Sequence, residues 1–124
     1  MCGISSFIGD ENAYRKILDG LLQLQNRGYD SAGISIFKDG NIITHKYASS
    51  TNNSALDKLE KYNYENNHVG IGHTRWATHG AKTDTNSHPH MSFNERFVLV
   101  HNGIIENFQE IKSFLARQGI SCIS

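Results

Sequence analysis

An apolar helical repeat early in the chain, with strand-like segments on both sides, restricts the fold more than any other feature. Apolar residues recur there at three- and four-residue spacing and predict a helix with one buried face: Tyr14, Ile17, Leu18, Leu21 and Leu22. Apolar patterns typical of strands cover residues 2–9, 31–37 and 42–47, and Asp39-Gly40 predicts a hairpin turn between the last two. Gly20 inside the helix costs about 1 kcal/mol of helix propensity, which indicates close packing there.

The rest of the chain continues this mixture of elements. We expect a short helix over residues 55–62, a glycine-rich strand over 69–73, a long polar loop over 74–94 and a strand buried on both faces over 96–101. An amphipathic helix follows, with Asn107 as its N-cap, Glu110 completing a capping box and Gly119 just past its end. Residues 120–123 predict one more strand. This order of elements predicts an α+β fold.

Composition and charge exclude several classes of function. Twelve basic and twelve acidic residues balance without any block of like charge, so we expect neither nucleic acid nor an anionic membrane as partner. No apolar run is long enough to span a membrane, and no basic-then-apolar secretory signal opens the chain. Cys2 and Cys122 are too few for a disulfide framework, which predicts a reducing, cytoplasmic setting.

Cys2 directly follows the initiator Met1. If Met1 is removed, Cys2 carries a thiol and a free α-amine, whose unperturbed pKa values are about 8.5 and about 7.7–8.0. The amine can then accept the proton of the thiol, as in other enzymes with an N-terminal nucleophile. On this pair of residues alone, an ordinary buried thiol is the simpler interpretation.

Residues 73–80 concentrate hydrogen-bond donors, with Arg75, Trp76, two threonines and two histidines. An arginine fork can hold a carboxylate through two parallel hydrogen bonds. We therefore favour a carboxylate site over a solvated loop with Trp76 in the core. The nearby His88-Pro89-His90 run suggests a metal site, but the irregular spacing of histidines and cysteines is not that of zinc sites. We predict neither a metal nor a cofactor.

Asn102-Gly103, between two apolar runs, has two interpretations. An Asn-Gly pair in this position is a strong signal for a tight hairpin. Alternatively, the Asn102 side-chain amide and the Gly103 backbone N–H can point at a developing oxyanion, where one such donor typically contributes about 2.7–4 kcal/mol to transition-state stabilisation. The two interpretations are compatible, because one tight turn can present both donors.

Together these segments resemble the glucosamine-6-phosphate synthase family, whose glutaminase halves are class II amidotransferase domains. The matching runs, in the family's order, are Cys-Gly-Ile at 2–4, Arg-Gly-Tyr-Asp-Ser-Ala-Gly at 27–33, His-Thr-Arg-Trp-Ala-Thr-His-Gly at 73–80, His-Pro-His at 88–90 and His-Asn-Gly-Ile-Ile-Glu-Asn at 101–107. The resemblance covers nearly the whole chain. It implies the N-terminal-nucleophile hydrolase fold, an αββα sandwich, of which this chain would form the N-terminal half.

The resemblance also implies roles for the matching residues. Cys2 would attack the side-chain amide of L-glutamine, giving a thioester and ammonia, with its own α-amine as general base. Asn102 and Gly103 would form the oxyanion hole. The remaining roles would fall to Arg75, Thr78 and His79 at the glutamine α-carboxylate end, Trp76 as a lid or gate, His88 as support and Arg27 in positioning Asn102.

In this family, sugar-isomerase domains use the ammonia to convert fructose 6-phosphate into glucosamine 6-phosphate, in an enzyme that we expect to be a homo-oligomer. We expect residues 1–124 to form a partial glutaminase domain without the sugar-isomerase domains, so fructose 6-phosphate would bind only outside this chain. An acidic Glu-Thr-Asp segment of the family, whose Asp binds the glutamine α-amine, would lie beyond Ser124, and Asn26 replaces the usual Tyr. The isolated chain should therefore be a weak glutaminase at best. The alternatives are another class II amidotransferase, or a non-catalytic remnant that binds glutamine or a partner.

Overall fold

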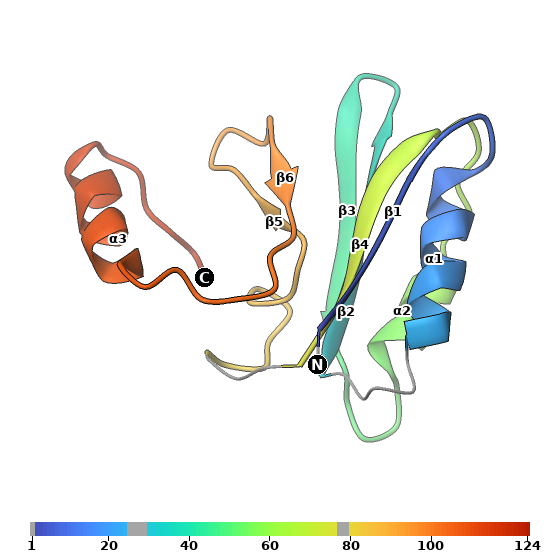
Figure 1. Cartoon of the computed structure of the whole chain (residues 1–124), viewed down its shortest axis with the longest axis horizontal. Helices are drawn as coiled ribbons and strands as arrows, with labels where there is room; N and C mark the ends of the chain where they lie inside the picture. The colour runs from blue at the N-terminus through green and yellow to red at the C-terminus, as the bar shows by residue number, and fades with distance from the viewer. Residues whose placement is uncertain (1, 25–29, 77–79) are drawn as a thin grey trace.

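In a computed structural model, which describes residues 2–24, 30–76 and 80–124, a four-stranded antiparallel sheet carries two helices on one face. A two-stranded hairpin and a third helix lie beyond the opposite face (Figure 1). The predicted α+β class is therefore confirmed at this level of description. No helix of the described residues is long and apolar enough to cross a membrane.

The sheet consists of β1 (Gly3–Ile8), β2 (Ser31–Lys38), β3 (Asn41–Ala48) and β4 (Val69–Arg75), in the order β1-β4-β2-β3. The predicted hairpin is confirmed, because Asp39 and Gly40 connect β2 to β3 with φ values of 53° and 81°, as tight hairpin turns require. β4 runs further into the predicted polar loop than expected, since Thr74 pairs with both Gly3 and Ala32.

Helices α1 (Ala13–Leu24) and α2 (Ala55–Glu60) cover one face of the sheet and bury the core with it. The predicted apolar face of α1 packs there, while Ser54 caps α2 by accepting a hydrogen bond from the Asp57 backbone N–H at 3.1 Å. The fully buried apolar residues are Ala13, Tyr14, Ile17, Leu18, Leu21, Ala32, Ile34, Ile36, Ala55, Leu56 and Leu59.

Glycines let α1 approach the sheet closely. A Cβ at Gly70 would lie 2.8 Å from Ile17 Cδ1, and a Cβ at Gly72 would overlap Ile17 Cγ2. On the helix itself, a Cβ at Gly20 would overlap Ser5 Oγ. The close packing predicted from Gly20 is thus confirmed, and the glycine-rich strand owes its composition to the helix above it.

Side chains alternate between the two faces of the sheet. Because Gly70 and Gly72 face α1, His73 and Arg75 of β4 lie on the opposite face. Cys2, one residue before Gly3, lies on that face as well, since a Cβ at Gly3 would meet Leu24 of α1. Part of this face carries exposed apolar side chains from three strands, namely Ile4, Ile8, Phe37 and Val69.

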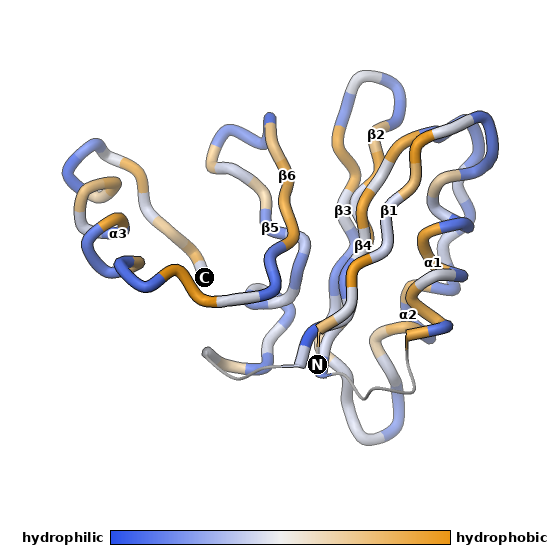
Figure 2. Tube along the Cα trace, viewed as in Figure 1, coloured by the Kyte–Doolittle hydropathy of each residue, from blue (hydrophilic) through white to orange (hydrophobic). Residues whose placement is uncertain are grey.

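The segment after β4 departs from the predicted strand over residues 96–101. Only β6 (Val98–Leu99) forms there, paired with β5 (His90–Met91) inside the predicted loop. Phe97 and Leu99 are 68% and 57% exposed. The prediction of a doubly buried strand is wrong because, among the described residues, β6 has one partner strand and no layer over its apolar side chains. Figure 2 shows this apolar stretch and residues 104–105 lying apart from the main core.

Helix α3 (Phe108–Arg117) forms where the sequence predicts it, but its ends behave differently from each other. Asn107 is the N-cap residue, yet its side chain makes no capping hydrogen bond within the described residues, so the predicted capping box is wrong. At the other end, Gly119 has φ of 80° and donates to the Ala116 carbonyl, while the Ile120 N–H donates to the Leu115 carbonyl. These two bonds form a Schellman motif and confirm Gly119 as the terminating residue.

Residues 120–123 form no strand in the described structure, so that prediction is also wrong. The turn at Gly119 directs the segment back toward the middle of the molecule (Figure 1), where no described strand pairs with it. Within Phe108–Arg117, all of which is described, no residue is buried. The apolar face predicted for this helix exists, but among the described residues no buried core packs against it.

We predict that Gly20→Ala destabilises the protein although alanine is the better helix former. The new Cβ would overlap Ser5 Oγ and lie 3.1 Å from Ser5 Cβ, and overpacking costs about 1–3 kcal/mol against a propensity gain of about 1 kcal/mol. Urea unfolding of Gly20→Ala, Ser5→Ala and the double variant measures this contact. The loss should be smaller in the Ser5→Ala background, and equal losses in both backgrounds would contradict it.

Candidate active site

The Cys2 thiol lies at the end of the sheet, against the backbone that leaves β4. Antiparallel pairing of Gly3 with Thr74 brings Cys2 beside Trp76. The Trp76 backbone N–H donates to Cys2 Sγ at 3.3 Å, and the Trp76 carbonyl lies 3.6 Å from the same sulfur. Met1 lies outside the described residues, so its removal stays a prediction.

Asn102 reaches Cys2 from the far end of the described chain. Its side-chain Nδ2 donates to the Cys2 backbone carbonyl at 3.3 Å. Its Oδ1 lies 2.6 Å from Nε2 of His73 on β4. The predicted proximity of Cys2 and Asn102 is therefore present, through a contact between residues 100 positions apart.

The Asn102-Gly103 pair does not make the predicted hairpin, because no strand pairing follows it in the described residues. It lies in an irregular segment between β6 and α3. Gly103 has φ of 154°, and a Cβ there would lie 3.0 Å from His101 Nε2. The segment is held instead by side chains, and Gly103 lines the same cavity as Cys2.

Arg75 is 8% exposed and holds the loop that follows β4. Its Nη1 donates to the Ala81 carbonyl at 3.0 Å, and Asn86 Nδ2 donates to the same carbonyl at 3.0 Å. The loop is also tied to β3, where Lys46 Nζ donates to the Thr85 carbonyl at 3.2 Å. Arg75 thus lies at the cavity, at the end of β4, and holds the loop that follows it, while its contact with a substrate carboxylate stays a prediction.

His88 belongs to a stack of three histidine rings on the face of the sheet opposite the helices. The ring of His88 stacks on His73 with centroids 4.3 Å apart and meets His90 edge-on at 4.4 Å. Its Nδ1 accepts a hydrogen bond from the His101 backbone N–H at 3.4 Å. The His88-Pro89 turn packs directly over Gly33 of β2, where a Cβ would overlap the His88 carbonyl oxygen.

The electrostatics of this stack favour neutral rings. Burial, reinforced by the charges of neighbouring histidines, Arg75 and Lys46, lowers the pKa of His88 to about 3. Burial with Lys46 and Arg75 lowers the pKa of His90 to about 4. Burial also lowers the pKa of His73, although its hydrogen bond with Asn102 acts in the opposite direction. The stack therefore supplies neutral rings rather than positive charge at neutral pH.

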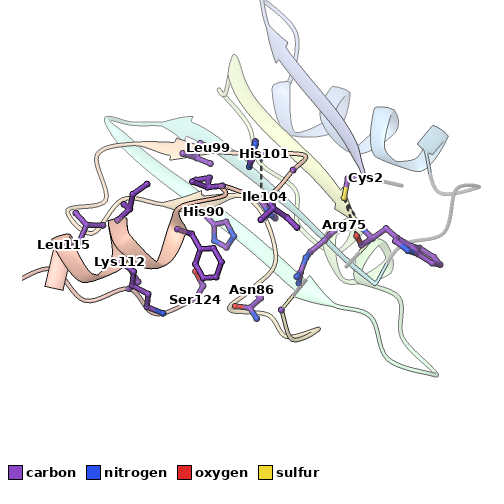
Figure 3. Close-up of a pocket in the computed structure, with 18 residues that line it drawn as sticks. Cys2, Arg75, Asn86, His90, Leu99, His101, Ile104, Lys112, Leu115 and Ser124 are labelled. Carbon is purple, nitrogen blue, oxygen red and sulfur yellow. Dashed lines mark hydrogen bonds between the residues drawn. The ribbon is translucent and has the colours of Figure 1, made fainter. Parts of the chain in front are cut away.

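A cavity of about 530 Å³ connects these groups, within the range of about 300–1,000 Å³ typical of small-ligand sites. Figure 3 shows Cys2 and Arg75 on one side of it, and Lys112 and Leu115 of α3 on the other. Trp76 also lines it, with a side chain 50% exposed. Of the predicted site residues, the structure brings together Cys2, Arg75, Trp76, His88 and Gly103 around the cavity, with Asn102 beside Cys2.

Three predicted site residues, Arg27, Thr78 and His79, lie outside the described residues. Two described residues of the site, His73 and His90, were given no role from the sequence, and His73 is the one that contacts Asn102. The signal for His73 is its place in β4, two residues from Arg75 and therefore on the same face of the sheet. Among the described residues, no group of three or more histidine, cysteine, aspartate or glutamate side chains could hold a metal ion.

Comparison with known proteins agrees with these observations. Residues 20–117 match the family model of class-II glutamine amidotransferases. The chain is 49% identical over all 124 residues to glutamine–fructose-6-phosphate aminotransferase [isomerizing] of Caldanaerobacter subterraneus subsp. tengcongensis, and 49% to the protein of that name in Staphylococcus aureus. It is 47% identical over 120 residues, 96% of this chain, to the one in Streptomyces coelicolor. The chain spans about a fifth of the length of these curated relatives, namely 20%, 20% and 19%.

We predict that the histidine stack makes the protein less stable as pH falls from about 6.5 to 5. The folded pKa values of His73, His88 and His90 lie below the unfolded value, so the unfolded chain binds more protons in this window and the free energy of unfolding decreases. Urea unfolding at pH 7, 6 and 5 measures the slope.

The matched comparison is His88→Gln against His68→Gln, since His68 is exposed and outside the stack. His88→Gln should flatten the slope between pH 6.5 and 5, and His68→Gln should leave it as in the unmodified protein. The window stays above the range where most carboxylates titrate. A slope in His88→Gln as steep as in the unmodified protein would contradict the neutral stack.

Proposed function

Because the chain belongs to the class-II glutamine amidotransferases, we propose that it hydrolyses L-glutamine to glutamate and ammonia, with Cys2 as the nucleophile. The observation that carries the proposal is the meeting of Cys2 and Asn102 beside one cavity, although 100 positions separate them in the sequence. An amide hydrolase needs a nucleophile and an oxyanion donor at one carbon atom, and this contact supports that arrangement.

The first step forms a thioester. After removal of Met1, the α-amine of Cys2 takes the proton of the thiol, and Sγ attacks the side-chain carbonyl carbon of glutamine. The Trp76 N–H at 3.3 Å from Sγ supports the developing thiolate. When the C–N bond breaks, the protonated α-amine returns the proton to the leaving nitrogen, which departs as ammonia.

Asn102 and Gly103 stabilise the negative charge that develops on the glutamine oxygen, by donating hydrogen bonds to it. Of the two N–H groups on Asn102 Nδ2, one donates to the Cys2 carbonyl, and both therefore lie on the Cys2 side of the amide. The Gly103 N–H would be the second donor. Donors fixed before the reaction stabilise the transition state without reorganising during it.

Arg75 binds the other end of the substrate, the α-carboxylate. We assign this role because the guanidinium group can donate two parallel hydrogen bonds to a carboxylate. Trp76 lines the cavity as a lid, and His88 supports the site through its stacking on His73. Thr78 and His79 would complete the carboxylate contacts, and Arg27 would help to position Asn102. Water then hydrolyses the thioester, releases glutamate and restores the Cys2 thiol.

The same proposal includes the finer fold, an αββα sandwich of the N-terminal-nucleophile hydrolases. It is supported by the sheet, which has α1 and α2 on one face and exposed apolar side chains on the other. A second sheet packed on Ile4, Ile8, Phe37 and Val69 would bury them, as facing sheets do in sandwiches. Residues 1–124 would then be one part of a glutaminase domain.

In the full-length protein, we propose that the ammonia aminates fructose 6-phosphate to give glucosamine 6-phosphate. The support is the name of the relatives, which are 47–49% identical to this chain over 96–100% of its length. Fructose 6-phosphate would bind outside these 124 residues, since the chain spans about a fifth of those relatives. The cytoplasmic location and the homo-oligomeric state belong to the same proposal.

We predict that 6-diazo-5-oxonorleucine, a glutamine analogue with an electrophilic carbon, alkylates Cys2 with loss of N₂. Cys122 is the matched control, because it is an exposed thiol that lines the same cavity. Peptide mapping of the full-length protein should find the label on Cys2 in the unmodified and Cys122→Ala forms, and no label in Cys2→Ala. Intact mass should show Met1 removed. Labelling that survives Cys2→Ala, or full glutaminase activity with Met1 attached, would reject Cys2 as the nucleophile.

We also predict that substitutions at Arg75 and Asn102 change different kinetic constants. Arg75→Lys should raise KM about ten- to a hundredfold with little change in kcat, because a point charge does not replace a charge-assisted fork. Asn102→Ala should lower kcat about 10²–10³-fold, because its donor acts in the transition state.

The control for Arg75 is Asn86→Ala, which weakens the shared hold on the Ala81 carbonyl and leaves the guanidinium in place. Ammonia release from glutamine is measured in the full-length protein. If Asn86→Ala raises KM as much as Arg75→Lys, Arg75 serves the loop and not the carboxylate.

A further inference from the structure

Among the described residues, His73 is a buried side chain that contacts Asn102, one of the two proposed oxyanion groups. It is 0% exposed, on the central strand β4, and its Nε2 lies 2.6 Å from Asn102 Oδ1. Asn102 itself is exposed and lies in a segment without regular secondary structure. A residue of the buried sheet thus contacts a residue of an exposed, irregular segment.

The chemistry of the ring determines which nitrogen carries the proton. Among the described residues, His73 Nδ1 is buried and has no hydrogen-bond partner. A neutral imidazole carries one N–H, and Nδ1 lacks a partner whether or not it holds that proton. The proton is assigned to Nε2 by the partner there, because Asn102 Oδ1 can accept it while Nδ2 of the same amide donates to the Cys2 carbonyl. Burial lowers the pKa of His73 and keeps the ring in this neutral form.

This tautomer matches one of the two orientations of the Asn102 amide. With Oδ1 turned to His73, Nδ2 faces Cys2 and donates to its carbonyl at 3.3 Å. If the amide rotated by half a turn, Oδ1 would face the Cys2 carbonyl oxygen, and two acceptors would oppose each other. Nδ2 would then face His73 Nε2 and would need the other tautomer of the ring, with the proton on Nδ1. The Cys2 carbonyl therefore favours one orientation of the amide, and His73 stabilises that orientation with the N–H on Nε2.

We propose that His73 is a positioning residue that orients the Asn102 side-chain amide, so that Nδ2 rather than Oδ1 faces the reacting carbon beside Cys2. This rests on the proposed glutaminase function. The inverted amide would present an acceptor to the developing oxyanion, which repels it. The ring of His73 is held in turn by its stacking on His88 at 4.3 Å. Supporting groups of this kind keep catalytic donors within the narrow geometry that they need.

The first test compares His73→Phe with His73→Gln in the full-length protein. Phenylalanine keeps a flat ring against His88 but has no donor, whereas glutamine places an N–H near the position of Nε2. His73→Phe should lower kcat for glutamine about ten- to a hundredfold, less than the 10²–10³-fold loss for removing an oxyanion donor, with KM within about twofold. His73→Gln should recover most of that loss. Thermal unfolding of each variant separates a folding defect from a kinetic one.

The second test asks whether His73 acts through Asn102. In the Asn102→Ala background, His73→Phe should cost no more than about twofold in kcat, because the amide that it orients is absent. Equal losses in both backgrounds, or a loss in His73→Gln as large as in His73→Phe, would overturn the proposal. So would an active His73→Phe enzyme with unchanged kcat.

The third test needs no turnover. Nitrogen-15 NMR of the imidazole groups at pH 7 should find His73 protonated on Nε2. It should also detect the hydrogen bond that this proton makes with Asn102 Oδ1. A proton on Nδ1 would overturn the inference even in an inactive sample. If the unmodified protein releases no ammonia and does not react with 6-diazo-5-oxonorleucine, the proposed function fails, and the NMR result still decides the orientation of Asn102.

Discussion

The antiparallel pairing of β1 with β4 is the constraint on which the site depends. With Gly3 opposite Thr74, Cys2 lies against the backbone of Trp76, and His73 and Arg75 lie on the same face as the thiol. A slip of one residue would turn every side chain of a strand to the other face. The helix-covered face would then receive the polar groups, and the thiol would be separated from its backbone donor.

The close packing of α1 on the sheet favours that register. The helix packs where Gly70 and Gly72 have no side chain, and Gly20 leaves room for Ser5 in β1. A shifted β4 would put Ile71 or His73 under the helix, where their side chains would clash with Ile17. The glycines in the strand therefore do more than permit close packing, because they admit only one alignment of β4 beneath α1.

Local patterns predicted the parts of the fold that carry their own signal. The spacing of Tyr14, Ile17 and Leu21 predicted α1, and Asp39-Gly40 predicted the turn of the first hairpin. Residues 96–101 and 120–123 read as strands from composition, but a strand also needs a neighbouring edge, which no local pattern records. Asn102-Gly103 failed as a hairpin for the same reason. Likewise, motifs placed Cys2, Arg75 and Asn102 near one another, whereas a histidine inside a strand looks like an ordinary core residue until its hydrogen bond is seen.

The two walls of the cavity differ in how deeply their residues are buried. The sheet wall carries Cys2, Arg75 and His73 and is continuous with the buried core, whereas the opposite wall is α3, within which no described residue is buried. Elements with few buried contacts open at low free energy, while the core opens only near the global unfolding limit. Molecules could therefore enter and leave by displacement of α3 alone. Cys2 and Arg75 would then stay on the sheet wall, whereas Asn102 and Gly103 lie on the exposed segment that leads into α3, so opening of the cavity would separate the nucleophile from the proposed oxyanion donors.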